Sequence, residues 1–189
     1  GGDESAAGGI YRFQGSWDAF STEKSVGKIE WRVEHRSNIG GVPAPQSLGG
    51  TYTAAINTGF PYGDNFDTDI PILSWKQVFT EQRWGYAVGR LAFDVYLDPS
   101  AVQSPYRGYL NRSFVLNPTL ATTGLGALGA VAKGFISDKV WIGGQIYDGN
   151  AANGDFDWDT IEEGEFLKAL EIGWTPSFAR RSTDKIQLT

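Results

Sequence analysis

Charged side chains occupy every second position between Lys28 and Arg36. This run reads Lys-Ile-Glu-Trp-Arg-Val-Glu-His-Arg, so basic and acidic groups alternate along one parity of the chain. Ammonium and guanidinium groups donate hydrogen bonds and carboxylates accept them. A row of mixed donors and acceptors suits neutral, polyhydroxylated molecules better than a row of one sign does. The chemistry that this spacing favours is therefore reversible, non-covalent contact with polar solutes.

The positions between these charges are apolar or aromatic. Strict alternation of this kind predicts a β-strand with two unlike faces, because successive side chains of a strand point to opposite sides. Two architectures carry such a strand. One is a half-buried strand of a soluble sheet, whose charged face is solvated. The other is a strand of a transmembrane barrel, whose apolar face meets lipid and whose polar face meets a water-filled lumen.

The preceding stretch, at about 10–20, repeats the pattern. Tyr11, Phe13 and Trp17 share one parity, and polar residues share the other. Near the end of the chain, Glu171 lies on the parity opposite to Leu170 and Ile172. The residues that we expect to line a polar surface on these stretches are Arg12, Gln14, Asp18, Lys28, Glu30, Arg32, Glu34, Arg36 and Glu171.

Composition supports an all-β fold. The 189 residues include 25 glycines, and 14% of the residues are aromatic, which suits many turns and ring-bearing strands. Cysteine is absent, which excludes disulfides and cysteine-based metal sites. A net charge of −6 argues against general binding of nucleic acid. The sequence has no apolar run of about eighteen residues, but barrel strands need only about 9–11 alternating residues.

Eight strand candidates follow one another along the chain. They lie at about 10–20, 26–38, 71–81, 84–96, 126–136, 140–147 and 164–175, and from 183 to the end. The alternation breaks in the second half of 84–96, which predicts a bulge or bend there. The connections alternate between short and long, and the long ones cover roughly 39–70, 97–125 and 149–163. Outer-membrane barrels have this asymmetry, with short periplasmic turns and longer outer loops.

This rhythm also bears on the domain organisation. If all the short turns are periplasmic, both ends of the chain lie on the outer side, whereas complete barrels usually have both ends in the periplasm. We therefore expect residues 1–189 to form one β-barrel segment that is incomplete at both ends, with at least one strand before it and more after it.

Several segments carry a family resemblance. They are Gly89-Arg90-Leu91 with Phe93-Asp94-Val95-Tyr96, Leu110 to Phe114 with Asn117-Pro118-Thr119, Ala127 to Phe135 with Tyr147-Asp148, and Glu163 to Phe166 with Leu170 to Thr175. Together these segments resemble the carbohydrate-selective porin family (OprB type) of Gram-negative outer membranes. The resemblance implies a transmembrane antiparallel β-barrel of about sixteen strands, of which this chain supplies about eight.

The resemblance further implies a function in the bacterial outer membrane. We expect a water-filled channel for passive diffusion of carbohydrates and other small hydrophilic solutes, with no catalytic step. The expected partners are small carbohydrates and outer-membrane lipid, and a homo-oligomer is compatible because porins are often trimers. The resemblance also implies a lumen position for Arg90, although the break in alternation leaves its direction open.

Other candidate sites are weaker. The acidic loop 148–159 offers oxygen ligands for Ca²⁺ but lacks regular calcium-loop spacing with a closing glutamate, so a solvated loop is favoured and no cofactor is expected. Trp158 in that loop either stacks on a sugar ring or pins the loop. His35 is the single histidine, which leaves a histidine-based triad or zinc site without a second histidine. Nucleophile-elbow, P-loop and dinucleotide-binding motifs are absent.

Two alternatives to the porin interpretation stay open. One is a soluble β-sandwich or lectin-like module that binds sugars. The other is a self-contained eight-stranded outer-membrane barrel that acts as an adhesin or anchor, which the length fits and the expected position of the termini disfavours.

Overall fold

The structure is a computed structural model, which describes residues 8–39, 66–79, 81, 83–92, 96, 126–150 and 163–175. These residues form seven β-strands, and the protein is therefore all-β in its described elements. The strands are β1 (Gly8–Ser21), β2 (Ser25–Asn38), β3 (Phe66–Phe79), β4 (Trp84–Leu91), β5 (Ala127–Phe135), β6 (Val140–Asp148) and β7 (Phe166–Trp174).

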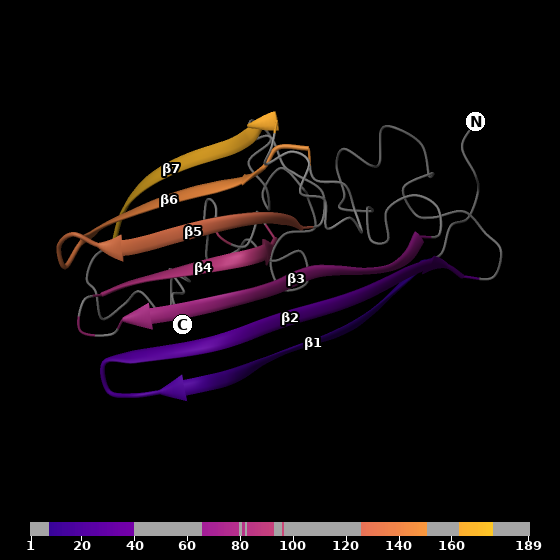
Figure 1. The fold of residues 1–189 in the computed structure, drawn as a ribbon, viewed down its shortest axis with the longest axis horizontal. Coiled ribbons are helices and arrows are strands. Elements are labelled where there is room, and N and C mark those ends of the chain that lie inside the picture. The colour runs from indigo at the N-terminus through magenta and orange to yellow at the C-terminus, as the bar shows by residue number, and fades with distance from the viewer. Residues whose placement is uncertain are drawn as a thin grey trace. The chain divides into compact units, whose positions relative to one another are not determined.

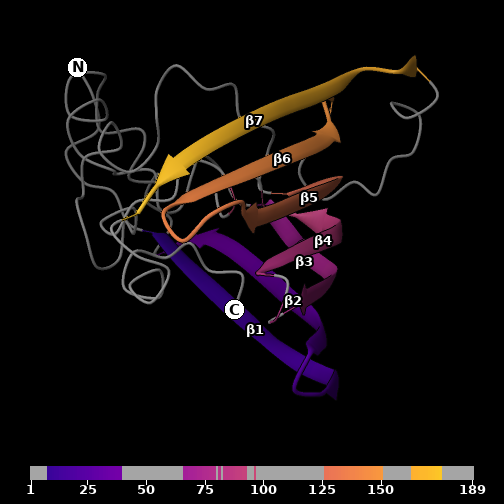
Figure 2. The ribbon, with the colours of Figure 1, turned by 90° about the vertical axis from the view of Figure 1, so that its left-hand side faces the viewer.

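The strands form one sheet in which neighbours in the sequence are neighbours in space, in the order β1-β2-β3-β4-β5-β6-β7. Figure 1 shows this antiparallel meander, in which the arrowheads of adjacent strands alternate in direction. Figure 2 shows β4, β5, β6 and β7 following one another from a second direction. Within the described part of the chain, β1 and β7 are the two end strands of the sheet.

Short turns fix this order. Between β1 and β2 the amide of Thr22 donates to the carbonyl of Ser25 at 2.9 Å. Between β5 and β6 the amide of Ile136 donates to the carbonyl of Val140 at 3.0 Å. Turns this short can join only adjacent antiparallel strands, which explains why the hairpin partners are neighbours in the sheet.

The chain divides into two compact units. The first contains Gly1–Phe13, Val33–Asp69 and Val102–Ala121, and the second contains Gln14–Arg32, Ile70–Ala101 and Thr122–Thr189. The boundary falls within the first three strands, so β1, β2 and β3 each contribute residues to both units. The last four strands lie wholly in the second unit.

The predicted fold class is confirmed at the level of an all-β, antiparallel meander, with some corrections to the strands. The predicted loop 39–70 is wrong at its end, because β3 already begins at Phe66. Aspartate and proline disfavour strands, so their presence around Asp69 and Pro71 hides this part of β3 from sequence patterning. Strand β4 ends at Leu91 rather than near residue 96. The strand predicted from 183 onward lies outside the described residues.

Within the described ranges, no helix is both long enough and apolar enough to cross a membrane.

Candidate functional site

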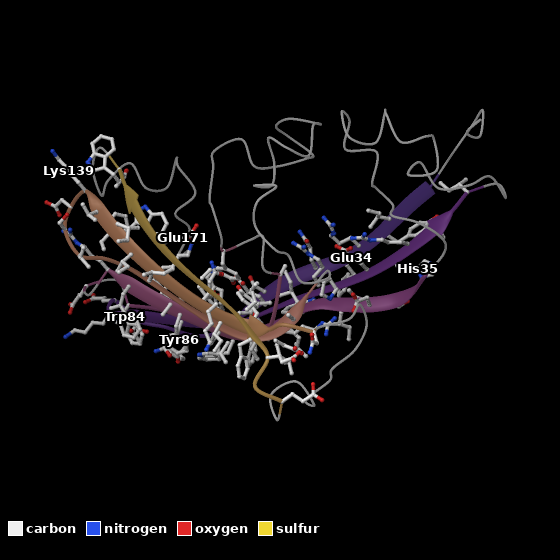
Figure 3. All side chains as sticks on the ribbon, turned by 90° about the horizontal axis from the view of Figure 1, so that it is seen from above. Glu34, His35, Trp84, Tyr86, Lys139 and Glu171 are labelled. Carbon is white, nitrogen blue, oxygen red and sulfur yellow. The ribbon has the colours of Figure 1, made fainter. Side chains whose placement is uncertain are left out.

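The sheet of the second unit has two chemically opposite faces. One face, called the apolar face, carries large hydrophobic side chains that are exposed. Its members include Leu73, Trp84, Val88, Ile142, Ile146, Leu170, Ile172 and Trp174. The other face, called the polar face, carries buried or half-buried polar groups. Its members include Ser74, Lys76, Lys133, Gln145 and Glu171. Figure 3 shows the labelled Trp84 and Tyr86 on one side of the sheet and Glu171 on the other.

Strand register produces this separation. Lys133 of β5 lies opposite Gly143 of β6, which in turn lies opposite Glu171 of β7. These three residues form one row across three strands, so their side-chain positions lie on the same face. Tyr86 of β4 lies opposite Ala132 of β5, and the side chains of this pair point to the other face of the sheet. The register therefore aligns the alternating pattern of each strand with that of its neighbours, so each face keeps one chemical character across several strands.

Lys133 is the centre of the best-defined polar cluster. Its ammonium nitrogen donates to Glu171 Oε2 at 2.8 Å and to the backbone carbonyl of Tyr96. The same nitrogen lies 5.0 Å from the centre of the Trp141 ring, in cation–π contact. A Cβ atom on Gly143 would lie 2.7 Å from Lys133 Cγ, so a glycine at this position leaves room for the lysine to cross β6 towards Glu171.

Two further polar pairs lie on the earlier strands of the second unit. Lys76 donates to Glu30 across the β2–β3 boundary, with 3.5 Å between Nζ and Oε1. Arg32 Nε donates to Gln14 Oε1 at 3.1 Å across β1 and β2. These bonds place Gln14, Glu30 and Arg32 among donors and acceptors on the strands for which the sequence predicted a polar lining. Lys28, on the same parity, is half-buried.

In the first unit, Glu34 lies between two arginines. Its carboxylate accepts from Arg12 at 2.7 Å and from Arg36 at 2.8 Å. The side chains of Glu34 and Arg36 are each only 2% exposed. On the neighbouring parity, the rings of Tyr11 and His35 lie 6.2 Å apart, which gives the single histidine an aromatic neighbour. The predicted polar residues of this unit therefore form one compact ionic triad.

Arg90 departs from the alternation of its strand. Its register partner Leu73 is 46% exposed, and Val88 of its own strand is 45% exposed, yet Arg90 is 1% exposed. Between Val88 and Arg90 stands Gly89 with φ of 129°, a conformation that other residues rarely adopt. We infer that this backbone irregularity turns Arg90 away from the exposed apolar face, in keeping with the break that the sequence predicted.

Aromatic rings gather where the β3–β4 hairpin turns. Phe79 and Trp84 stack with ring centres 4.5 Å apart, and the ring of Tyr86 lies 6.3 Å from that of Phe79 and 6.2 Å from that of Trp84. The Tyr86 hydroxyl donates to Gln77 Oε1 at 2.9 Å, and Gln77 Nε2 donates to Ser25 Oγ at 3.1 Å. The cluster thus has an apolar body and a polar tip, which is typical of rings at an interface between apolar and aqueous surroundings.

The alternation of β1 slips near its end. Gly15 lies against Trp31, as the odd parity requires, but Phe20 lies against Gly27 and Trp75 on that same apolar side. We infer that the alternation of β1 is interrupted between Gly15 and Phe20, because these two residues differ in parity and yet lie on the same side. Asp18 lies within this interval and is exposed. Its predicted place on the polar lining does not follow from the parity of the strand.

The candidates in the loop 148–159 fall mostly outside the described residues. Trp158 lies there, as does most of the acidic run considered for Ca²⁺. The described Asp148 accepts a hydrogen bond from the amide of Asn150 at 2.9 Å. Across the described ranges, no group of three or more His, Cys, Asp or Glu residues is arranged to hold a metal ion.

Several residues of the polar face were not predicted from the sequence. Lys76, Lys133 and Gln145 are each less than 8% exposed, and all three lie on the polar face. For Lys133 a signal was present, because it is the single charged residue in a strand otherwise made of small and apolar residues. Its partner Glu171 was predicted, but the pair joins β5 to β7, and only the register brings these residues together.

Comparisons of the chain with protein-family models, curated proteins and solved structures find no match. The chemistry of the site therefore follows from its geometry alone. Pairs of ammonium or guanidinium donors with carboxylate acceptors lie on one face of the sheet, and exposed apolar groups lie on the other.

Proposed function

We propose that this chain forms part of the wall of a transmembrane β-barrel of the bacterial outer membrane. In this proposal the apolar face contacts lipid and the polar face borders a water-filled channel. The observation that carries the proposal is the reversed distribution of polarity. Leu170 and Ile172 on the apolar face are each 71% exposed, whereas Lys76 and Lys133 on the polar face are each 7% exposed. A protein in water would gain free energy from the opposite arrangement.

Strand length supports the same proposal. The last three strands, β5, β6 and β7, have nine residues each, and the first three have fourteen each. A tilted strand needs about 9–11 residues to cross the hydrocarbon core of a bilayer. Each of these strands is therefore long enough, or nearly long enough, to span a membrane and in some cases to extend beyond it.

The meander supports a barrel, because backbone groups in hydrocarbon must all be hydrogen-bonded and only a closed sheet achieves this with strands. The proposed barrel has about sixteen strands, and this chain supplies about half of them. The end strands β1 and β7 would then pair with further strands of the same barrel. This step rests on the resemblance to carbohydrate-selective porins and on the open order of the described sheet.

The proposed transport is passive diffusion of carbohydrates and other small hydrophilic solutes, with no covalent step. Ion pairs such as Lys76–Glu30 and Lys133–Glu171 place donors and acceptors side by side. A wall of this composition hydrates the channel and offers hydrogen bonds to neutral sugars without a strong preference for one sign of charge. The proposed partners are therefore the solutes themselves and the surrounding lipid.

Liposome swelling tests the proposal. The protein that carries this chain is reconstituted into liposomes, and the swelling rate is measured with sugars of graded size. We expect swelling above that of protein-free liposomes. Arg32→Ala and Arg90→Ala should change the dependence of the rate on sugar size while the protein still inserts, because both remove bulky donors from the proposed wall.

The matched control is Lys139→Ala, which removes a cation from the exposed turn between β5 and β6 and should leave the size dependence unchanged. Swelling that equals that of protein-free liposomes, with the protein shown to be inserted, would contradict the proposed channel.

A further inference from the structure

Glu30 of β2 is a single carboxylate beside several cations. Lys28 and Arg32 stand two positions before and two positions after it, so the three side chains leave β2 on the same face. Lys76 of the neighbouring strand β3 places its Nζ atom 3.5 Å from Glu30 Oε1. All four residues belong to the second unit. This group, called the β2 cluster, contains three positive charges and one negative charge.

The β2 cluster lies on the polar face of the sheet. Lys76 belongs to that face, and its bond to Glu30 places the carboxylate there as well. Gly27 lies on the other side, against the ring of Trp75. Because successive side chains of a strand alternate between the two faces, Lys28 lies on the same face as Glu30. In the proposed channel, the β2 cluster therefore borders the water-filled side of the wall.

The cations of the cluster differ in how they are paired. Lys76, with a side chain that is 8% exposed, pairs with Glu30. Arg32 donates a hydrogen bond to the neutral amide of Gln14 at 3.1 Å. Lys28 is half-buried, and within the part of the chain that the structure describes it has no carboxylate and no hydrogen-bond acceptor as a partner. The ammonium group of Lys28 is therefore in partial contact with water and is not neutralised by the described chain.

An ammonium group in this state attracts carboxylates. It carries a full positive charge and several N–H donors, and a carboxylate accepts such bonds at short distance. Lys76 and Arg32 add to the attraction, because one carboxylate offsets only one of the three positive charges. The amide of Gln14 and the carboxylate of Glu30 are suited to hydrogen bonds with hydroxyl groups. The β2 cluster therefore matches a polyhydroxylated molecule with one carboxylate better than it matches a neutral sugar.

We propose that Lys28 is a specificity-determining residue of the channel wall, which binds the carboxylate of sugar acids and makes them pass faster than neutral sugars of the same size. The inference rests on the proposed channel and adds the charge of the favoured solutes. Binding at a half-buried lysine is weak enough for the solute to leave again, as conduction requires. The preference is local to β2, because at the Lys133–Glu171 pair one cation faces one carboxylate.

Three hexoses that differ in one group test the proposal. Glucuronate carries a carboxylate, glucose is neutral, and protonated glucosamine carries an ammonium group, while their rings are of nearly equal size. The protein that carries this chain is reconstituted into liposomes in a potassium salt, with valinomycin to carry the compensating charge, and the entry of each labelled sugar is timed. We expect glucuronate to enter about fivefold faster than glucose, and glucosamine to enter more slowly than glucose.

Substitutions of Lys28 separate its charge from its size. Lys28→Gln should bring the ratio of glucuronate entry to glucose entry close to that of an uncharged wall, a fall of about fivefold. Lys28→Arg keeps the positive charge and should keep the ratio. Lys28→Glu reverses the charge and should make glucuronate slower than glucose.

The matched control is Lys139→Gln, which removes the same charge from the exposed turn between β5 and β6. Four strand spacings separate β2 from β6, or roughly 19 Å, which exceeds the Debye length of about 8 Å at physiological salt. The control should therefore leave the ratio unchanged.

Three results would overturn the role of Lys28. One is a parent protein that admits glucose and glucuronate at equal rates, which requires no substitution. The second is an unchanged ratio in Lys28→Gln. The third is an equal fall in Lys139→Gln, because the preference would then belong to the whole protein surface. If the protein inserts and none of the three sugars enters, the proposed channel itself is contradicted, and the role of Lys28 in it is contradicted as well.

Discussion

At the scale of single residues, the polar groups of this protein are paired rather than merely placed on a face. Glu34 has an arginine on each side, and Lys133 has a carboxylate, a carbonyl and a ring. Each of these buried charges would destabilise the folded protein if its partner were absent. The ion pairs are therefore interdependent, and loss of one member is expected to cost more than the pair as a whole contributes.

Glu34 offers the clearest test of this interdependence. Glu34→Ala leaves Arg12 and Arg36 beside each other without the carboxylate between them. We expect the free energy of unfolding to fall by about 3 kcal/mol, the usual cost of breaking a buried pair by removing one partner. Urea unfolding of the reconstituted protein, followed by tryptophan fluorescence, measures this change.

The control for Glu34 is Glu81→Ala, which removes a carboxylate from the exposed turn between β3 and β4. It should change the free energy of unfolding by less than about 0.5 kcal/mol. A loss at Glu34 no larger than the loss at Glu81 would contradict the interdependence of the triad.

At the scale of the strands, glycines make room for large side chains from the neighbouring strand. Gly143 receives the stem of Lys133, Gly15 receives the ring of Trp31, and Gly173 receives the ring of Trp141. A Cβ atom added at any of these three positions would clash with the side chain that the glycine accommodates. Large side chains can therefore lie flat over a neighbouring strand while the strands keep their hydrogen-bonding distance.

Gly89 and Gly144 provide a matched pair of substitutions in β4 and β6. A Cβ atom on Gly89 would lie 2.5 Å from the carbonyl oxygen of Leu73, and the backbone there has φ of 129°. A Cβ atom on Gly144 would meet no atom within 4 Å. Gly89→Ala should therefore destabilise the protein by about 2 kcal/mol or more, whereas Gly144→Ala should change its stability by less than about 0.5 kcal/mol.

The resistance of the folded protein to heat in detergent, measured by the temperature at which its circular-dichroism signal is lost, compares these two variants. Equal temperatures for both would show that the backbone at Gly89 is not constrained. In that case the backbone conformation of Gly89 would not explain why the side chain of Arg90 is turned away from the apolar face.

At the scale of the whole molecule, the apolar face decides which surroundings suit the protein. Large apolar residues are exposed along several strands of the second unit, and contiguous exposed apolar surface marks contact with a partner or a membrane. The proposed partner is lipid. A charge on this face should then be more damaging than a charge on the polar face of the same strand.

Leu170 and Ala169 test this at adjacent positions of β7. Leu170 is 71% exposed on the apolar face, and Ala169 lies on the opposite parity, across from Gln145. Leu170→Lys should destabilise folding into lipid vesicles by about 2 kcal/mol or more, and Ala169→Lys should cost less than about 1 kcal/mol. Folding yield across a urea series, read from the difference in gel mobility between the folded and unfolded protein, measures both changes. A larger loss at Ala169 would reverse the assignment of the two faces.

The sequence alone determined the all-β class, the hairpin rhythm and the opposite character of the two parities, because alternation of side chains is a local property of a strand. It also indicated the irregularity near Arg90, where the alternation fails. The tertiary structure decided which residues meet. Lys133 and Glu171 are 38 residues apart, and Lys76 and Glu30 are 46 apart. No local pattern specifies such pairs, because they depend on the register between strands and on the glycines that let long side chains cross.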